Sequence, residues 1–356
     1  VELRGVTAHA LRRATREAMA AAGTFARALP AAAAAVGLAA WMPRLSFRGS
    51  GTPKQAFDAQ HLRVQELPPG TSCSSEPPRV RLLCQNVWNS FFAGGPDRIS
   101  RLQALREFVR REEVDVLVVQ EMFCFGLGPV ADQGEGQSFG EWMAALGLSH
   151  QTSLSSSMPV FGQSSGLAVY SRWPITEESH GTFAQRRVVS AKGWCEVMLD
   201  VGRNGPSSSK TKLILLNTHL EHAHTEKWRE VRRSQWMQVA ERTASFCARG
   251  DELVAVFGDF NIGEHAEWQV LRDGRTEYEA LSSGLRAANC PLDLFRGTPH
   301  RPTMRPEPGQ PSFAPDHCFV SRSLHDRILH ADIVDTRGDN GNIVSDHLGL
   351  LVDLRA

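Results

Sequence analysis

The stretch Val254-Ala255-Val256-Phe257-Gly258-Asp259-Phe260-Asn261 is an apolar run that ends in a carboxylate and a carboxamide. Such a run is typical of a strand buried on both faces of its sheet. Asp259 and Asn261 are two residues apart, so on an extended chain their side chains point to the same side. Together they are suited to orienting water and holding phosphate near a hard metal ion. The alternative is an Asx turn, because Asp and Asn are common turn residues.

Other predicted strands end in the same pattern of an apolar run followed by polar side chains. Residues 80–84 lead to Asn86, 114–119 lead to Glu121, and 213–216 lead to His219. The cluster Ser345-Asp346-His347 stands directly before a final apolar strand at residues 348–352. One polar residue after a strand is ordinary turn chemistry. The whole set is better explained as one functional site at the ends of several strands.

The polar set contains mainly oxygen donors and no cysteine, which favours a hard cation such as Mg²⁺ over zinc. Glu121 supplies a carboxylate ligand in this interpretation, and Asn86 adds a neutral oxygen beside it. A single acid at a strand end is usually a structural residue that caps the strand or forms a salt bridge, and the rest of the set favours the metal role for Glu121.

Two histidines complete the predicted site. His347 is a candidate general base, because an imidazole accepts a proton near neutral pH, and Asp316 is the best candidate to orient it. His219 stabilises or protonates phosphate oxygens in this interpretation. A lone histidine is more often a structural residue, and His222, His224 and His265 are assigned to that class. The combination is suited to metal-assisted attack of water on a phosphodiester, and no GxxxxGK[ST] motif indicates a phosphate-binding loop.

Composition limits the possible partners. The chain has 356 residues with 39 Lys and Arg and 39 Asp and Glu, so its net charge is zero. This balance argues against nucleic acid as the partner, because a basic face usually supplies much of that affinity. The seven cysteines are scattered, odd in number and without a CxxC pair, which predicts reduced thiols.

Three segments are expected along the chain. Residues 1–50 are rich in alanine and arginine, and their apolar run at 29–42 is shorter than the about 20 residues of a membrane span. This segment fits a signal peptide, a transit peptide, an interfacial helix or a plain alanine-rich helix. We expect it to be membrane-associated or to direct the protein to an organelle or the secretory route. Residues 51–78 are expected to be a linker, and 79–356 the catalytic domain.

Within residues 79–356 the patterns predict an α/β domain with many strands and few helices. The helices are expected from about residue 97, at 142–146 and at 226–247. Further strands are expected at 166–171, 194–201 and 317–320, and residues 172–175 are expected to end the first of these.

The motifs Gln85-Asn86-Val87, Gln120-Glu121, Asn217-Thr218-His219, Gly258-Asp259-Phe260-Asn261 and Ser345-Asp346-His347, in this order, resemble those of the endonuclease/exonuclease/phosphatase superfamily, whose fold is deoxyribonuclease I-like. The resemblance implies a four-layered α/β sandwich of two packed mixed β-sheets flanked by helices, with a Mg²⁺ site at the sheet rims. It also implies a role for each matched residue. The implied metal residues are Glu121, Asn86 and Asp346, and the implied catalytic residues are His347, His219, Asp259, Asn261 and Asp316.

Two further stretches are similar to neutral sphingomyelinases. They are Gly166 to Ile175, which is similar to "GLxxxSRxPI", and Ser190-Ala191-Lys192-Gly193, which is similar to "SxKG". His317 stands where that branch usually has an aromatic residue. The resemblance implies a Mg²⁺-dependent phosphodiesterase that cleaves sphingomyelin, or a related phospholipid, to ceramide and phosphocholine. It also implies a phospholipid partner at a membrane surface, and we expect a monomer. The alternatives are a nuclease, a phosphoinositide phosphatase or, less favoured, a non-catalytic binding protein.

Overall fold

The computed structural model describes residues 79–355 except 90–96, 126–127, 130–138, 154–163, 187–190, 202–210, 224, 249–251, 265, 267, 297–300 and 306–312. The chain divides into two compact units, Val1–Ser72 and Cys73–Ala356, and every described residue belongs to the second. The expected targeting segment at 1–50 and linker at 51–78 therefore lie outside the described residues, as do His224 and His265. Among the described residues, no helix is long and apolar enough to span a membrane.

Two mixed sheets form the centre of the second unit, each with six strands in its described part. The first sheet has the order β13-β14-β1-β2-β6-β5. Its strands are β1 (Arg79–Asn86), β2 (Val116–Gln120), β5 (His150–Gln151), β6 (Ala168–Ser171), β13 (Ile328–Val334) and β14 (Gly349–Arg355). The second sheet has the order β11-β12-β10-β9-β8-β7. Its strands are β7 (Ile175–Thr182), β8 (Gly193–Val201), β9 (Thr211–His219), β10 (Leu253–Asp259), β11 (Leu292–Asp293) and β12 (Asp316–Val320). A small separate pair joins β3 (Cys124–Phe125) to β4 (Gly128–Pro129).

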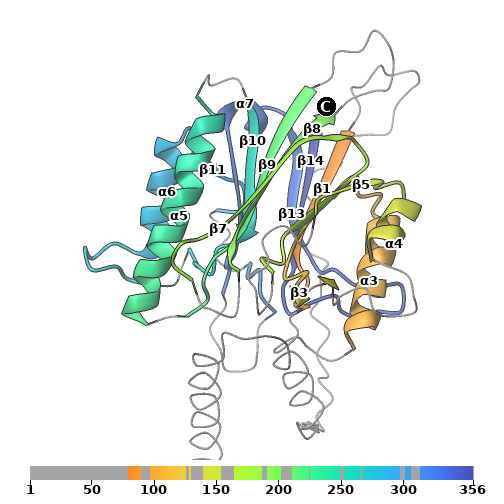
Figure 1. The fold of residues 1–356 in the computed structure, drawn as a ribbon, viewed down its shortest axis with the longest axis horizontal. Helices are drawn as coiled ribbons and strands as arrows, with labels where there is room; N and C mark the ends of the chain where they lie inside the picture. Colours follow the sequence, from red (N-terminus) through yellow and green to blue (C-terminus); the bar gives the residue numbers. More distant parts are fainter. Residues whose placement is uncertain are drawn as a thin grey trace, which may run out of the picture. The chain divides into compact units, whose positions relative to one another are not determined.

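Helices cover the outer face of each sheet (Figure 1). On one side lie α3 (Arg98–Arg111) and α4 (Phe139–Ala145), and on the other lie α5 (Glu226–Phe246) and α6 (Glu277–Ala287). The short α7 (Arg322–His325) follows β12. This arrangement confirms the predicted four-layered α/β sandwich.

Each interface between layers has its own apolar core. Between the sheets, side chains such as Val118, Leu215 and Phe257 form one buried cluster. A second cluster packs α3 and α4 on the first sheet, and a third packs α5 and α6 on the second. The central strands are apolar on both sides because both of their faces are buried in these clusters.

The strand directions bring the predicted polar residues to one end of the sandwich. The strands β1 and β2 are parallel, with Asn86 beside Gln120, and β9 and β10 are parallel, with His219 beside Asp259. The strand β12 runs antiparallel to β10 and begins at Asp316, directly opposite Asp259. The carboxyl ends of four strands and the start of a fifth therefore form one rim.

A hydrogen bond between two buried amides joins the sheets just below this rim. Gln120 Nε2, at the end of β2, donates to Asn217 Oδ1 on β9 over 2.7 Å. Asn217 Nδ2 in turn donates to the carbonyl of Val119 over 2.8 Å. Both amides are fully buried. Because buried polar groups need partners, this pair ties the register of one sheet to that of the other.

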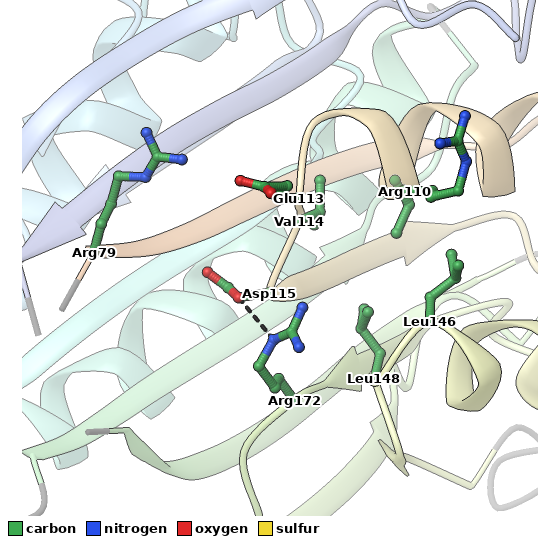
Figure 2. A pocket seen from close by; sticks show the side chains of 9 residues that line it. Arg79, Arg110, Glu113, Val114, Asp115, Leu146, Leu148 and Arg172 are labelled. Carbon is green, nitrogen blue, oxygen red and sulfur yellow. Dashed lines mark hydrogen bonds and ion pairs between the residues drawn. The ribbon is translucent and has the colours of Figure 1, made fainter. Parts of the chain in front are cut away.

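The other end of the sandwich holds a cavity of about 360 Å³, where β1 and β2 begin (Figure 2). Its lining includes Arg79, Asp115 and Arg172, and Asp115 Oδ1 accepts a hydrogen bond from Arg172 Nε over 2.9 Å. None of the predicted site residues lines it. The predicted chemistry therefore lies at the opposite end of the strands from this cavity.

Several elements were not predicted from the sequence, among them β7, β13 and α6. The segment at 172–175 was expected only to end a strand, but β7 begins at Ile175, and β13 and α6 were not anticipated. The strands β7 and β13 lie at sheet edges and are largely exposed or half-buried, so they lack the apolar run that marks a central strand. The helix α6 does have a sequence signal, a capping box between Thr276 and Glu279.

His317 forms a buried ion pair in the core between β12 and α6. Its Nδ1 lies 2.9 Å from Asp293 Oδ2 and its Nε2 lies 2.6 Å from the carbonyl of Ile262. Both partners are acceptors, an arrangement that favours the doubly protonated form of the ring. Burial alone would lower the pKa of His317, but Asp293 and the Ile262 carbonyl raise it above its usual value. The ring also packs against Phe260, with centroids 5.7 Å apart, which explains how a histidine replaces an aromatic residue here.

We expect His317→Phe to lower the free energy of unfolding most at about pH 6. The raised pKa means that the stabilising contribution of His317 is fully present below its unfolded-state value of about 6.5 and is lost as the pH rises through the folded-state value. Urea unfolding at several pH values measures this. The difference in unfolding free energy between wild type and His317→Phe should narrow as the pH rises. The same difference for the exposed His330→Ala should show no such trend. If the difference for His317→Phe did not depend on pH, the charged pair of His317 and Asp293 would not stabilise the fold.

We expect Asn217→Leu to destabilise the protein by about 1–3 kcal/mol, because Gln120 loses its acceptor in the core. The double variant Gln120→Leu/Asn217→Leu should recover part of this loss, since it removes both polar partners. Chemical denaturation of the single and double variants measures the coupling. Strictly additive losses would show that the two amides do not stabilise each other.

Candidate active site

Asp259 is at the centre of the rim. Its Oδ2 lies 3.1 Å from Asn86 Nδ2, 3.3 Å from His219 Nε2 and 3.9 Å from His347 Nε2. Burial would raise the pKa of Asp259, but His219, His347 and Lys192 together hold it well below its usual value. Asp259 is therefore an ionised carboxylate that gathers side chains from both sheets.

His347 belongs to a hydrogen-bonded chain at one side of Asp259. Its Nδ1 lies 2.7 Å from Asp316 Oδ2, and Thr303 Oγ1 donates to the same oxygen over 2.6 Å. Burial alone would lower the pKa of His347, but Asp316, Asp259 and Asp346 raise it to about 10. Asp316 thus fixes the ring with Nε2 directed toward Asp259, the geometry expected of an oriented base.

His219 lies on the other side of Asp259. Its Nε2 is 3.8 Å from Glu121 Oε1 and is also in close contact with Lys192 Nζ. Lys192 is buried and stands at the start of β8, so its ammonium points into the rim rather than to solvent. His219 Nδ1 is buried and has no hydrogen-bond partner within the described part of the structure. This side of the rim therefore gathers a cation and an imidazole, both suited to binding phosphate oxygens.

Glu121 and Asp346 are the two partly exposed carboxylates of the rim. Burial raises the pKa of Asp346, His347 lowers it, and the negative charge of Glu121 raises it again. A cation near Asp346 would offset the negative charge that Glu121 places beside it. Asn86 Oδ1 accepts a hydrogen bond from the backbone N–H of Trp88 over 2.9 Å, while its Nδ2 donates to Asp259 in the same rim. These oxygen donors fit a hard divalent ion.

The described residues contain two groups of side chains whose atoms are close enough to hold one metal ion: Glu121, His219 and Asp259 form one, and Asp259, Asp316 and His347 form the other. In the second group His347 and Asp316 are already hydrogen-bonded to each other. The first group, with Asp346 and Asn86 beside it, is therefore the better candidate.

The backbone of the rim is strained at two predicted residues. Glu121 has φ 62° and Asn261 has φ 54°, in the left-handed region that disfavours side chains. Such residues cost about 1–3 kcal/mol each and are often found at functional sites. Asn261 is held by its own N–H, which donates to Asp259 Oδ1 over 2.9 Å, and by Gln269, which donates to its carbonyl over 2.8 Å.

The structure brings all eight predicted site residues to this rim: Asn86, Glu121, His219, Asp259, Asn261, Asp316, Asp346 and His347. Sequence reasoning assigned no role to Lys192 or Thr303. Lys192 was noted only within a family-like segment, whose Ser190 lies outside the described residues. Thr303 is in an irregular segment without periodicity, and no sequence signal identifies it.

Several solved structures are similar to this chain. They include the beta toxin of Staphylococcus aureus with bound magnesium ions (17% identity, covering 77% of this chain and 99% of that chain, TM-score 0.54) and sphingomyelinase C from Streptomyces griseocarneus (17%, 78% and 99%, TM-score 0.50). A truncated Caenorhabditis elegans TDP2 is equally similar (17%, 78% and 98%, TM-score 0.52). At these identities the likeness shows the fold alone. No curated protein sequence matches the chain significantly.

Residues 85–347 match the Endonuclease/Exonuclease/phosphatase family. This range contains every residue of the rim, from Asn86 to His347, and covers most of the chain. The family, the two-sheet fold and the cluster of acidic and histidine side chains agree with one another. This chain therefore belongs to the Endonuclease/Exonuclease/phosphatase family and is a metal-dependent phosphoester hydrolase.

Proposed function

We propose that this protein is a Mg²⁺-dependent phosphodiesterase that hydrolyses sphingomyelin, or a related phospholipid, to ceramide and phosphocholine. The observation that carries this proposal is the contact between Lys192 and His219. Lys192 comes from the segment that resembles neutral sphingomyelinases, so a branch-specific motif is part of the catalytic rim. The zero net charge also supports a lipid over a nucleic acid.

Exposed apolar side chains near the rim support a substrate at a membrane surface. Trp268 is 47% exposed and precedes Gln269, which holds Asn261. Ile343 is 37% exposed and lies just before the segment that carries Asp346 and His347. Apolar side chains around a polar rim would let the protein contact lipid while the rim receives a charged head group.

The side chains suggest how water is activated. Glu121, Asp346 and Asn86 would hold Mg²⁺, which when bound neutralises charge on the phosphate oxygens. His347 Nε2 takes a proton from water, and the resulting hydroxide oxygen bonds to phosphorus. The bond from phosphorus to the ceramide oxygen breaks, and that oxygen takes up a proton.

The remaining side chains position these groups. Asp316 holds the ring of His347, and Asp259 and Asn261 orient the water and the phosphate. His219 and Lys192 bind the phosphate oxygens on the other side of Asp259, where positive charge stabilises the charge that develops during attack.

A substrate panel with and without Mg²⁺ tests the proposed function directly. We expect phosphocholine release from sphingomyelin in mixed vesicles, and loss of that release when the ion is chelated. The panel also contains lysophospholipids, a 5-phosphoinositide, plain DNA and abasic DNA. Hydrolysis of DNA alone would identify a nuclease, and release of inorganic phosphate from the phosphoinositide would identify a phosphatase.

We expect His347→Ala to reduce turnover by about 10²–10⁴-fold, the usual contribution of a general base. In the wild type, kcat/KM should rise with pH, because the base must be neutral and its pKa is raised to about 10 by Asp316, Asp259 and Asp346 against the effect of burial. Raising Mg²⁺ from a limiting to a saturating concentration should shift this rise to lower pH, since the ion offsets the carboxylate charge. The variant His330→Ala, at an exposed site on β13, is the control for folding and general histidine loss. Wild-type activity in His347→Ala would refute the base assignment.

A further inference from the structure

Arg101 is a buried arginine in the first turns of α3, only 6% exposed. Its Nη1 donates to the carbonyl of Val87 over 2.8 Å and to that of Val344 over 3.0 Å. Its Nη2 donates to the carbonyl of Trp88 over 2.9 Å, and the guanidinium lies 5.2 Å from the centroid of the Trp88 ring. One planar cation therefore holds the backbone at three points.

These carbonyls belong to the two segments that leave the first sheet at the rim. The strands β1 and β14 pair side by side as far as Cys84 and Leu350. Beyond this point, β1 leads through Asn86 to Trp88, and the segment from Val344 to His347 leads into β14. Beyond Cys84 and Leu350, the backbone hydrogen bonds between β1 and β14 no longer set the distance between these two segments. Arg101 connects the segments there instead.

The charge of Arg101 also lies near the metal-binding carboxylates. Burial lowers the pKa of Arg101, whereas the negative charges of Asp346 and Glu121 raise it. Val87 follows Asn86 directly, and Val344 is two residues before Asp346. A shift of either carbonyl would therefore move a predicted metal ligand.

We propose that Arg101 is a positioning residue that sets the separation between the Asn86 segment and the Asp346–His347 segment. It does so without touching substrate, and through this separation it controls metal affinity and turnover. The inference rests on the proposed metal-dependent function, because it concerns the residues assigned there to the ion and the base.

The planar shape of the guanidinium is essential to this role. An arginine presents several N–H groups in a fixed fork, whereas a lysine presents one compact ammonium. Lysine at position 101 would keep the charge, but its shorter side chain ends in a single nitrogen, so it cannot reproduce all three contacts that Nη1 and Nη2 make together. Arg101→Lys therefore separates the effect of the positive charge from the effect of the guanidinium geometry.

The test compares Arg101→Lys and Arg101→Met with Arg106→Met. Arg106 is an exposed residue of the same helix, and its guanidinium lies 5.8 Å from the centroid of the Trp142 ring, so it is a matched control away from the rim. Hydrogen exchange by mass spectrometry on the metal-free proteins should show faster exchange in both segments, 86–89 and 344–348, for Arg101→Lys. Calorimetric Mg²⁺ titration should show affinity weakened by about 10- to 100-fold, as for other residues that orient metal ligands. The kcat should fall while KM changes little.

Arg101→Lys keeps the test valid if Arg101→Met does not fold. Exchange and Mg²⁺ affinity equal to those of Arg106→Met would overturn the inference. The exchange measurement needs neither metal nor substrate, so it separates the two proposals. If the wild type bound no Mg²⁺ and cleaved none of the panel, the proposed function would fail, while faster exchange in both segments would still establish the link made by Arg101.

Discussion

One buried carboxylate, that of Asp259, constrains the whole rim. Its oxygen Oδ2 receives Asn86 from the first sheet and His219 from the second, with His347 on its third side. An ionised carboxylate in a protein interior costs several kcal/mol unless partners compensate it. The two sheets must therefore converge here, and the buried amide pair of Gln120 and Asn217 holds them at the required distance. The geometry that stabilises this charge is the same geometry that assembles the reactive groups.

The central strands were predictable because burial on both faces leaves an unmistakable apolar run. The same rule explains what was missed. The edge strand β7 carries Glu177, Glu178 and His180, so its composition does not distinguish it from a loop. The helix α6 was overlooked although Thr276 and Glu279 form a capping box at its start. Edge elements are specified by their neighbours more than by their own sequence.

The site was predictable to the extent that its residues follow strands. Asn86, Glu121 and His219 each end an apolar run, and parallel strands place such ends together. Thr303 follows no strand, and its bond to Asp316 depends on a tertiary contact that periodicity cannot report. Lys192 stands before a strand rather than after one, so the same rule did not select it. The strand-end residues of the rim are therefore readable from the sequence, whereas Lys192 and Thr303 depend on contacts outside that pattern.

The order of the strands has a consequence for synthesis on the ribosome. The strand β14 is the last described strand in the chain, but it lies inside the first sheet, between β13 and β1. Until residues 349–355 have been made, β1 keeps an open edge on that side and His347 has no strand to hold it. Pairing between segments so distant in sequence is slow to form, and an open edge is prone to aggregation meanwhile. Insertion of β14 therefore both closes the edge of β1 and positions the segment that carries His347.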